Sequence, residues 1–482
     1  MTELCDLGAV ELRRRIGAKE ISPVELLISC LQRIEAVNPA LNAVTATCID
    51  RAKTEAKAAE AAVLRGDTLG LLHGLPIGIK DLNETAGLRT TWGSPLYADY
   101  VPEKDERMVA AVRKAGAIVV GKTNVPEFGA GANTNNPVYG PTGNPFDPKR
   151  ICGGSSGGSA VALATSMLPI CTGSDTGGSL RIPAAFCGIV GYRPSVGLVA
   201  SERRPVGWTP ITTQGPMGRN VEDTLLLLQA QISDDSHDPL AFRVDPRDFA
   251  AFTPVDLGSL RVAVSDDLGI VPLDPRIRQT FRDRVERIKS VFRSCGWRNP
   301  EMADADEAFG ILRAQNFLAA HRERYEKHRD KLGPNIIANV EQGLKMTLAD
   351  GARGQVLATK IYRAFQELFR DVDLLICPTV PVPPFPLEQR YMDVIDGKKL
   401  PTYYSWLAPT YALSLTGHPS MSLPCGLEPT GTPFALQLCG PARSDKFLLN
   451  AAHALERHLA KDPTTARPLP DLARLAQGSK SR

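Results

Sequence analysis

The segment Ile151–Pro183 reads ICGGSSGGSAVALATSMLPICTGSDTGGSLRIP, with two glycine and serine clusters on either side of an apolar run. The first cluster is GGSSGGS at 153–159, and the second is GSDTGGS at 173–179. The wider segment 129–197 is dense in small and polar residues but has no simple repeat, which distinguishes it from a flexible linker. Because glycine allows close approach of the backbone to other groups, we expect this segment to pack tightly around a site.

Two common motifs fit this segment poorly. A phosphate-binding Walker loop needs a lysine after its glycines, and neither cluster has one. The residues GGSSG at 153–157 satisfy the G-x-S-x-G pattern of a nucleophile elbow, but the preceding residues 147–152 contain a proline and make a poor strand. The histidine base of such a hydrolase is also missing, since His418 precedes a proline and His453 and His458 belong to a surface-type helix. The sequence therefore favours neither phosphate binding nor a Ser-His-acid triad.

A serine nucleophile with a lysine base fits the sequence better. A serine hydroxyl needs an adjacent base, and lysine can serve when burial lowers its pKa. Lys80 ends the apolar run LPIGIK at 75–80, which predicts a buried strand that delivers the amine at its end. The turn TGGS at 176–179 can aim several backbone N–H groups at one point. A developing oxyanion needs such donors, and each can be worth about 3–4 kcal/mol.

On these residues the chain resembles the amidase-signature enzymes, a family that includes fatty-acid amide hydrolase, malonamidase and the A subunit of glutamyl-tRNA amidotransferase. The resemblance spans about 20–460, is tightest over 73–197, and rests on the glycine- and serine-rich signature with a second serine 24 positions after the first. It implies that Lys80 is the catalytic base, that Ser155 is a bridging serine after a cis peptide bond, and that Ser179 is the acylated nucleophile.

The resemblance also implies the surroundings of these three residues. It places four backbone N–H groups in an oxyanion hole, those of Thr176, Gly177, Gly178 and Ser179. It assigns a substrate-facing loop of small residues to Gly129, Ala130 and Gly131. Four aromatic residues lie in regions that often line the pocket, and whether they line it or only pack remains open: Trp208, Tyr403, Tyr404 and Trp406. The implied mechanism requires neither a metal ion nor a cofactor.

Composition bounds the remaining possibilities. The chain has 482 residues, of which 43% are hydrophobic and 23% charged, so it can build a core. The net charge of +3 gives no electrostatic case for binding nucleic acid or an acidic membrane. No apolar stretch is long enough for a membrane helix, and the acidic start MTELCD does not look like a signal peptide.

Ten scattered cysteines without a CxxC pair suggest reduced thiols, so we expect a cytoplasmic protein. We also expect a monomer or homodimer whose partner is a small-molecule amide substrate.

Strands alternate with helices along the chain, which predicts an α/β fold. Short apolar runs predict strands at 75–80, 117–120, 261–264, 374–377, 421–425 and 434–438. With the resemblance, we expect one domain over 1–482, with a large, mixed, twisted sheet covered on both faces by helices. Its parts are a signature core at about 73–197, a variable, mostly helical insertion at about 265–370, and C-terminal strands and a helix at about 372–460. The charged part of the insertion, 304–370, fits either a lid or an interface.

Which type of amidase-signature enzyme this chain represents, and which substrate it cleaves, is harder to predict. We expect a free-standing amidase acting on an aryl or apolar amide, with esters, anilides or carbamates as further substrates. The alternative is the glutamine-hydrolysing A subunit of an aminoacyl-tRNA amidotransferase, which uses an arginine on the helix before the Leu374 strand. At that place this chain has Ala358, Arg363 is out of register, and 403–409 lacks the expected acidic residue. A non-catalytic scaffold is the alternative of another class, although all three chemical residues are present.

Overall fold

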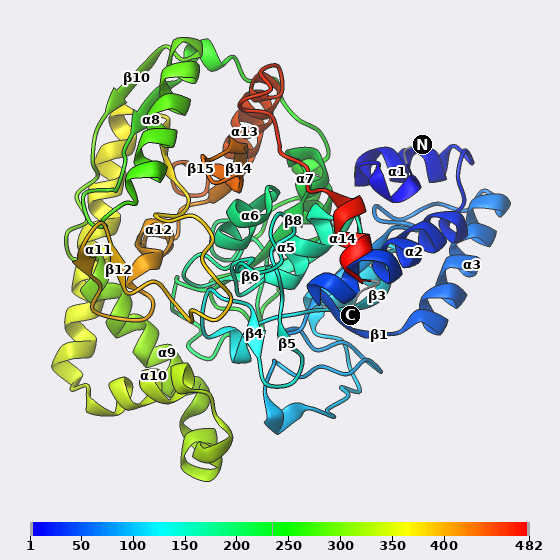
Figure 1. Ribbon diagram of the computed structural model, residues 1–482, viewed down its shortest axis with the longest axis horizontal. Coiled ribbons are helices and arrows are strands. Elements are labelled where there is room, and N and C mark those ends of the chain that lie inside the picture. The colour runs from blue at the N-terminus through cyan, green and yellow to red at the C-terminus, as the bar shows by residue number, and fades with distance from the viewer. Residues whose placement is uncertain (1–2, 234, 480–482) are drawn as a thin grey trace.

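The computed structural model describes residues 3–233 and 235–479, and its centre is one mixed β-sheet (Figure 1). The strands of this sheet are β1 (Val44–Thr47), β2 (Pro76–Lys80), β3 (Ile118–Thr123), β6 (Ile170–Asp175), β7 (Val190–Arg193), β8 (Thr213–Gly218), β9 (Arg261–Val264), β10 (Ser294–Trp297), β11 (Leu374–Pro378), β14 (Ser420–Leu427) and β15 (Pro433–Cys439). Their order is β1-β3-β2-β6-β8-β7-β14-β15-β11-β9-β10. Strand β2 is parallel to β3 and β6, whereas β8 is antiparallel to β6 and β7. The predicted α/β fold with a large mixed sheet is confirmed.

Two further strand pairs lie outside this sheet. They are β4 (Asn135–Asn136) with β5 (Gly140–Pro141), and β12 (Val394–Ile395) with β13 (Lys398–Lys399). The helices are α1 (Ala9–Gly17), α2 (Pro23–Leu41), α3 (Ile49–Arg65), α4 (Arg107–Lys114), α5 (Gly157–Ala164), α6 (Arg181–Cys187), α7 (Val221–Gln231), α8 (Pro275–Ile288), α9 (Ala305–His328), α10 (Pro334–Lys345), α11 (Leu348–Asp371), α12 (Ala408–Thr416), α13 (Asp445–Leu459) and α14 (Leu472–Ser479). In Figure 1, α1–α3 lie on one side of the molecule and α8–α11 on the opposite side. Among the described residues, no helix combines the length and apolar character needed to cross a membrane.

The glycine-rich segment forms the buried centre of the fold, and it contains regular elements that its composition hides. All residues of α5 are buried, and the helix contacts β2, β3 and β6. Its first turn is pressed against other backbone: a Cβ at Gly158 would lie 2.2 Å from the Asn124 nitrogen and 2.5 Å from the Ala43 oxygen. A Cβ at Gly191 in β7 would lie 2.2 Å from the Leu180 oxygen. These glycines allow two helices to sit directly on the sheet.

The pairing of β2 with β6 determines where the Lys80 side chain lies. The two strands are parallel neighbours, with Ile77 opposite Ile170 and Gly78 opposite Cys171. Parallel strands end at the same edge of a sheet, so Lys80 at the end of β2 lies beside the end of β6. The carboxyl ends of strands are where open α/β sheets bind their ligands.

The helical insertion reaches this same edge. Helices α9, α10 and α11 pack on one another, and α9 also contacts α12. A Cβ at Gly177, just beyond β6, would lie 3.0 Å from the Phe309 ring of α9. The region expected to be mostly helical therefore forms one wall of the site. The division of the chain into a single domain stays a prediction.

We predict that Gly158→Ala destabilises the fold. The added methyl group would meet two backbone atoms that cannot rotate away, and overpacking of this kind costs about 1–3 kcal/mol. The measurement is the melting temperature of the purified variant. The control is Gly296→Ala in β10, where a Cβ has no neighbour within 4 Å. Equal melting temperatures for the two variants would contradict this view of the helix contact.

Candidate active site

The Lys80 amine lies between two serines. Its Nζ is 2.8 Å from Ser155 Oγ and 2.9 Å from Ser174 Oγ, with the Ser174 carbonyl oxygen at 3.3 Å. The lysine is fully buried, and its backbone N–H donates to Thr172 Oγ1 at 2.9 Å. A neutral amine in this position donates both N–H groups to Ser174 and accepts the hydroxyl hydrogen of Ser155.

Burial decides the protonation state of this amine. Removal from water disfavours the ammonium form and lowers the pKa of Lys80 to about 7, although the nearby Asp175 carboxylate acts in the opposite direction. A large share of the amine is therefore neutral near pH 7. A base with a pKa near the working pH is well suited to general base catalysis.

The bridging serine and the predicted nucleophile lie on adjoining loops. The Gly154–Ser155 peptide bond is cis, as the family resemblance implies. The next residue, Ser156, donates its backbone N–H to the Ser179 carbonyl oxygen at 3.2 Å, which ties the two loops together. Ser155 and Ser179 line the same cavity, and the Ser179 hydroxyl has no hydrogen-bond partner within 3–233 and 235–479. This hydroxyl is free to turn toward a substrate or toward Ser155.

A buried ionic cluster holds the turn that carries Ser179. Asp175 pairs with Arg181 at 2.9 Å and with Arg193 at 3.2 Å, and all three side chains are fully buried. Burial alone would raise the pKa of Asp175, but the two guanidinium groups outweigh it and hold that pKa well below its usual range. The carboxylate also accepts the N–H groups of Gly178 at 2.8 Å and Leu180 at 3.2 Å. The backbone on both sides of Ser179 is thereby fixed.

This cluster bears on the predicted oxyanion hole, which stays a prediction. The Gly178 N–H already donates to Asp175 at 2.8 Å, so it is not free in the way that the other three predicted donors are. The N–H groups of Thr176, Gly177 and Ser179 have no acceptor among the described residues. Motif spacing could not reveal this difference, because it depends on the turn placing the carboxylate beneath one particular amide.

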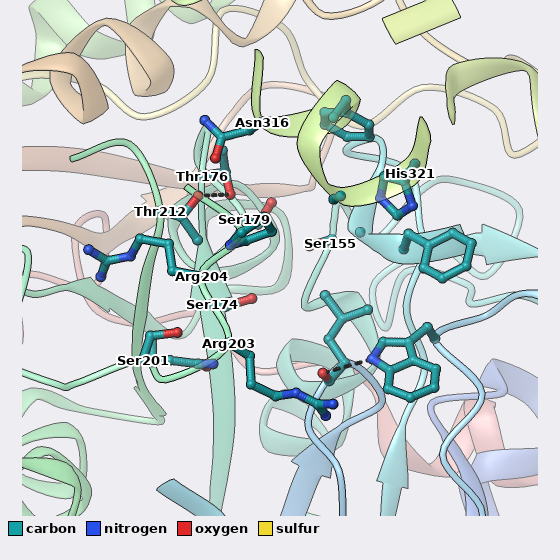
Figure 2. Close-up of a pocket in the computed structure, with 18 of the residues that line it drawn as sticks. Ser155, Ser174, Thr176, Ser179, Ser201, Arg203, Arg204, Thr212, Asn316 and His321 are labelled. Atoms are coloured by element: carbon teal, nitrogen blue, oxygen red, sulfur yellow. Dashed lines mark hydrogen bonds between the residues drawn. The ribbon is translucent and has the colours of Figure 1, made fainter. Parts of the chain in front are cut away.

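The cavity beside Ser155 and Ser179 has a volume of about 680 Å³. Figure 2 shows the two serines at its centre, with Asn316 and His321 on one side and Arg203 and Arg204 on the other. Its lining includes five aromatic side chains, Trp92, Tyr97, Tyr100, Phe128 and Phe317. It also includes six charged ones, Glu84, Glu106, Arg203, Arg204, Arg313 and Arg324. The cavity is thus partly aromatic and partly cationic.

The substrate-facing loop is only partly where we expected it. Gly129 and Gly131 line the cavity, and a Cβ at Gly129 would lie 3.3 Å from Ser155 Oγ. Ala130 does not line it. Both flanking glycines have positive φ, 71° and 141°, and the turn between them directs the Ala130 methyl group into a cluster with Leu332 and Ile336. Ala130 instead borders a neighbouring cavity of about 260 Å³.

The aromatic residues considered from the sequence are not the ones around the serines. Trp208 is 76% exposed and lines no part of the main cavity. Tyr403 and Trp406 border the neighbouring cavity, and Tyr404 is buried against Phe309. The sequence did contain a signal for the actual lining, since the cavity residues of α9 recur at helical spacing: Arg313, Asn316, Phe317, Ala320, His321 and Arg324.

His321 is one of these α9 residues that the sequence analysis did not single out. It is 8% exposed, its Nδ1 has no hydrogen-bond partner among the described residues, and its ring lies 4.7 Å from that of Phe128. Burial and the neighbouring Arg324 lower its pKa to about 3, so it is neutral at pH 7. In the described part of the chain, no group of three or more His, Cys, Asp or Glu residues is placed to hold a metal ion.

Comparison with known proteins relates the whole chain to one family. The family model described as Amidase matches residues 25–449. The A subunit of the glutamyl-tRNA(Gln) amidotransferase of Picosynechococcus is 33% identical, over 93% of this chain and 97% of that protein. The crystal structure of a bacterial aryl acylamidase of the amidase-signature family has a TM-score of 0.88 and 25% identity, over 99% of both chains. The A subunit of the corresponding amidotransferase of Thermotoga maritima has a TM-score of 0.74 at 23% identity, over 98% of this chain and 99% of that one.

We predict that Asp175→Asn destabilises the protein. The change leaves Arg181 and Arg193 buried without a counter-charge, and breaking a buried ion pair costs about 3–5 kcal/mol. The melting temperature should fall by several degrees. The matched control is Asp371→Asn, which removes an exposed partner of Arg298 and should melt almost like the parent. Similar melting of both variants would show that the buried cluster does not hold the turn.

Proposed function

The chain belongs to the Amidase family of amidase-type hydrolases, and we propose that it cleaves the C–N bond of a small carboxylic amide through an acyl-enzyme on Ser179. The observation that carries this proposal is the buried 2.8 Å contact between Lys80 Nζ and Ser155 Oγ beside the cavity that holds Ser179. A buried, neutral amine next to a chain of hydroxyl groups supplies the base that a serine nucleophile needs.

In the proposed mechanism, neutral Lys80 takes the hydroxyl proton of Ser155 as Ser155 takes that of Ser179. The Ser179 oxygen attacks the amide carbonyl carbon, and the negative charge develops on the carbonyl oxygen. The free N–H groups of Thr176, Gly177 and Ser179 are the proposed donors to this oxyanion. Ser155 then passes a proton to the leaving nitrogen and regains one from Lys80.

The second half of the reaction uses the same groups in the same order. After the amine leaves, a water molecule attacks the acyl carbon. As it attacks, it gives a proton to Ser155, and Ser155 passes its own hydroxyl proton to Lys80. Collapse of the second tetrahedral intermediate returns the proton to Ser179. Ser174 has a positioning role in this proposal, because its hydroxyl and carbonyl oxygens hold the Lys80 amine with its lone pair toward Ser155.

The cavity supports a substrate with an aryl or apolar portion. Five aromatic side chains line it, and aromatic linings favour such groups. The similarity to a bacterial aryl acylamidase agrees with this choice. Because an acyl-enzyme route tolerates different leaving groups, anilides, aryl esters and carbamates are also proposed substrates.

A second candidate is the glutamine-hydrolysing A subunit of an aminoacyl-tRNA amidotransferase, since a curated relative of that name is 33% identical. The residues expected to recognise glutamine are absent from the cavity. Ala358 is buried within α11, Arg363 is exposed, and neither lines the cavity. From 403–409 only Leu407 reaches the cavity. We therefore propose the free-standing amidase first. Whether it is a monomer or a homodimer stays a prediction.

The first test is an assay of the purified chain alone on glutamine, an aliphatic amide, an anilide, an aryl ester and an aryl carbamate. We expect turnover of the aryl substrates. We predict that Lys80→Ala and Ser179→Ala each lower kcat/KM about a thousandfold or more, since the relay acts as a unit. Mass spectrometry should locate an acyl adduct on Ser179 with a slow ester. The control is Ser290→Ala, an exposed serine far from the relay in sequence.

Other results of this assay point elsewhere. Activity confined to glutamine, or activity that requires added partner proteins, would favour the amidotransferase. Full aryl activity in Ser179→Ala would remove this serine as the nucleophile.

We also predict a pH profile with one acid limb. Only the neutral amine of Lys80 can accept a proton, so kcat/KM should rise with pH through about 7 and level off above it. Well below the pKa, the loss should approach about tenfold per pH unit. The profile is measured with an anilide whose own charge does not change over the range. A flat profile down to pH 5 would be incompatible with a lysine base.

A further inference from the structure

One face of α9 forms a wall of the cavity and carries two arginines. Arg313 and Arg324 lie eleven positions apart on this face, with Asn316 and His321 between them, and all four line the cavity. Figure 2 shows Asn316 and His321 on the side of the two serines opposite Arg203 and Arg204. The cavity that holds Ser155 and Ser179 is therefore lined by four arginines, Arg203, Arg204, Arg313 and Arg324.

The four cavity arginines differ in their partners. Arg203 pairs with Glu84 at 2.5 Å, and Arg204 pairs with Asp238 at 3.2 Å. Arg324 donates only to neutral oxygens, those of Tyr97 and Ala320. Arg313 likewise has no carboxylate within ion-pair distance anywhere in 3–233 and 235–479. Two positive charges on α9 thus lack a counter-ion in the described protein.

Arg313 is the more deeply buried of the two, at 5% exposure. Its Nε donates to Asn339 Oδ1 at 3.1 Å, and its Nη2 donates to the Tyr403 hydroxyl at 2.5 Å. Asn339 in turn donates to the same hydroxyl at 2.7 Å. The guanidinium carbon lies 4.6 Å from the ring centre of Phe317 and 5.3 Å from that of Tyr404. The Nη1 group donates to no described residue.

These contacts hold the Arg313 guanidinium in one position at the cavity and leave part of its N–H groups without an acceptor. A buried charge is costly unless it is paired, and arginine is rarely this buried without an anion. The hydrogen bonds to Asn339 and Tyr403 hold the group in place without neutralising it. The guanidinium is largely buried among aromatic rings, and the lower dielectric constant of such surroundings strengthens any electrostatic contact made there.

We propose that Arg313 binds an anionic group of the substrate, so that this enzyme prefers amides that carry a carboxylate. The inference rests on the proposed amidase function and names the substrate class of the same site. The aromatic lining takes the apolar part of such a substrate. The edge formed by Nη1 and the second N–H of Nη2, which the bonds to Asn339 and Tyr403 leave unused, takes the carboxylate. An arginine fork suits a carboxylate, because it donates two parallel hydrogen bonds.

The test measures binding in the Ser179→Ala background, so that it does not depend on turnover. The probes are two matched pairs, each an anion with a neutral compound of similar shape. Succinyl para-nitroanilide and isocaproyl para-nitroanilide place the difference on the acyl side. Para-acetamidobenzoate and para-isopropylacetanilide place it on the amine side. Titration calorimetry gives the dissociation constant of each.

We expect at least one anion to bind about thirtyfold or more tightly than its neutral match, and Arg313→Gln to remove the preference while leaving the neutral compound's affinity almost unchanged. Arg313→Lys keeps the charge but loses the fork, so it should retain only part of the preference. The matched control is Arg322→Gln, an exposed arginine of the same helix that pairs with Glu326. This control should keep the full preference.

Two results would overturn the inference. One is equal binding of the anionic and neutral compounds in both pairs. The other is a preference that survives Arg313→Gln, or Arg313→Met should the glutamine variant fail to fold, since another cation would then hold the anion. If the parent chain hydrolyses none of the compounds but the preference in Ser179→Ala behaves as expected, the proposed function fails while the anion site stands.

Discussion

The burial of one amine is the constraint on which the site depends. Lys80 can act as a base only if it is kept from water and yet held in contact with a hydroxyl group, and the structure meets both conditions with Ser155 and Ser174. Three separate segments must therefore converge: the end of β2, the end of β6 and the start of α5. The parallel pairing of β2 with β6 brings the first two together, and the glycines of α5 allow the third to approach.

The site contains two opposite solutions to the burial of arginine. Beneath the Ser179 turn, Arg181 and Arg193 share the carboxylate of Asp175, and the cluster is closed and electrically satisfied. On α9, Arg313 is held by an amide and a phenol, and its charge is left uncompensated beside the cavity. The first arrangement fixes backbone geometry, and the second leaves an electrostatic demand that a ligand can meet. The Asp175 cluster thus supports the backbone of the site, whereas Arg313 is available to contact a ligand.

The sequence predicted the fold class. It also singled out Lys80, Ser155 and Ser179, which lie in short motifs and which the structure brings to one buried contact and one cavity. It did not reveal β6, β7 and β8, since their glycines reflect close packing of helices on the sheet and look like loop residues in isolation. It could not show that the Gly178 N–H donates to Asp175, because that bond depends on the conformation of the turn between them. Nor could it show the direction of the Ala130 methyl group, which depends on packing against Leu332 and Ile336, about 200 residues further along the chain. The cavity wall on α9 was missed because the helical spacing of its residues marks a common face but does not say what that face contacts in the fold.

The cavity wall on α9 can change in sequence independently of Lys80, Ser155 and Ser179. Lys80 ends β2, and Ser155 and Ser179 lie on the loops just before α5 and α6, whereas much of the cavity wall belongs to α9, a separate helix in the C-terminal half. Exchanges at positions such as 313, 317 or 321 alter what enters the cavity without displacing the lysine or the serines. Related chains can thus differ in what the cavity accepts through changes in one helix, while Lys80, Ser155 and Ser179 keep their places.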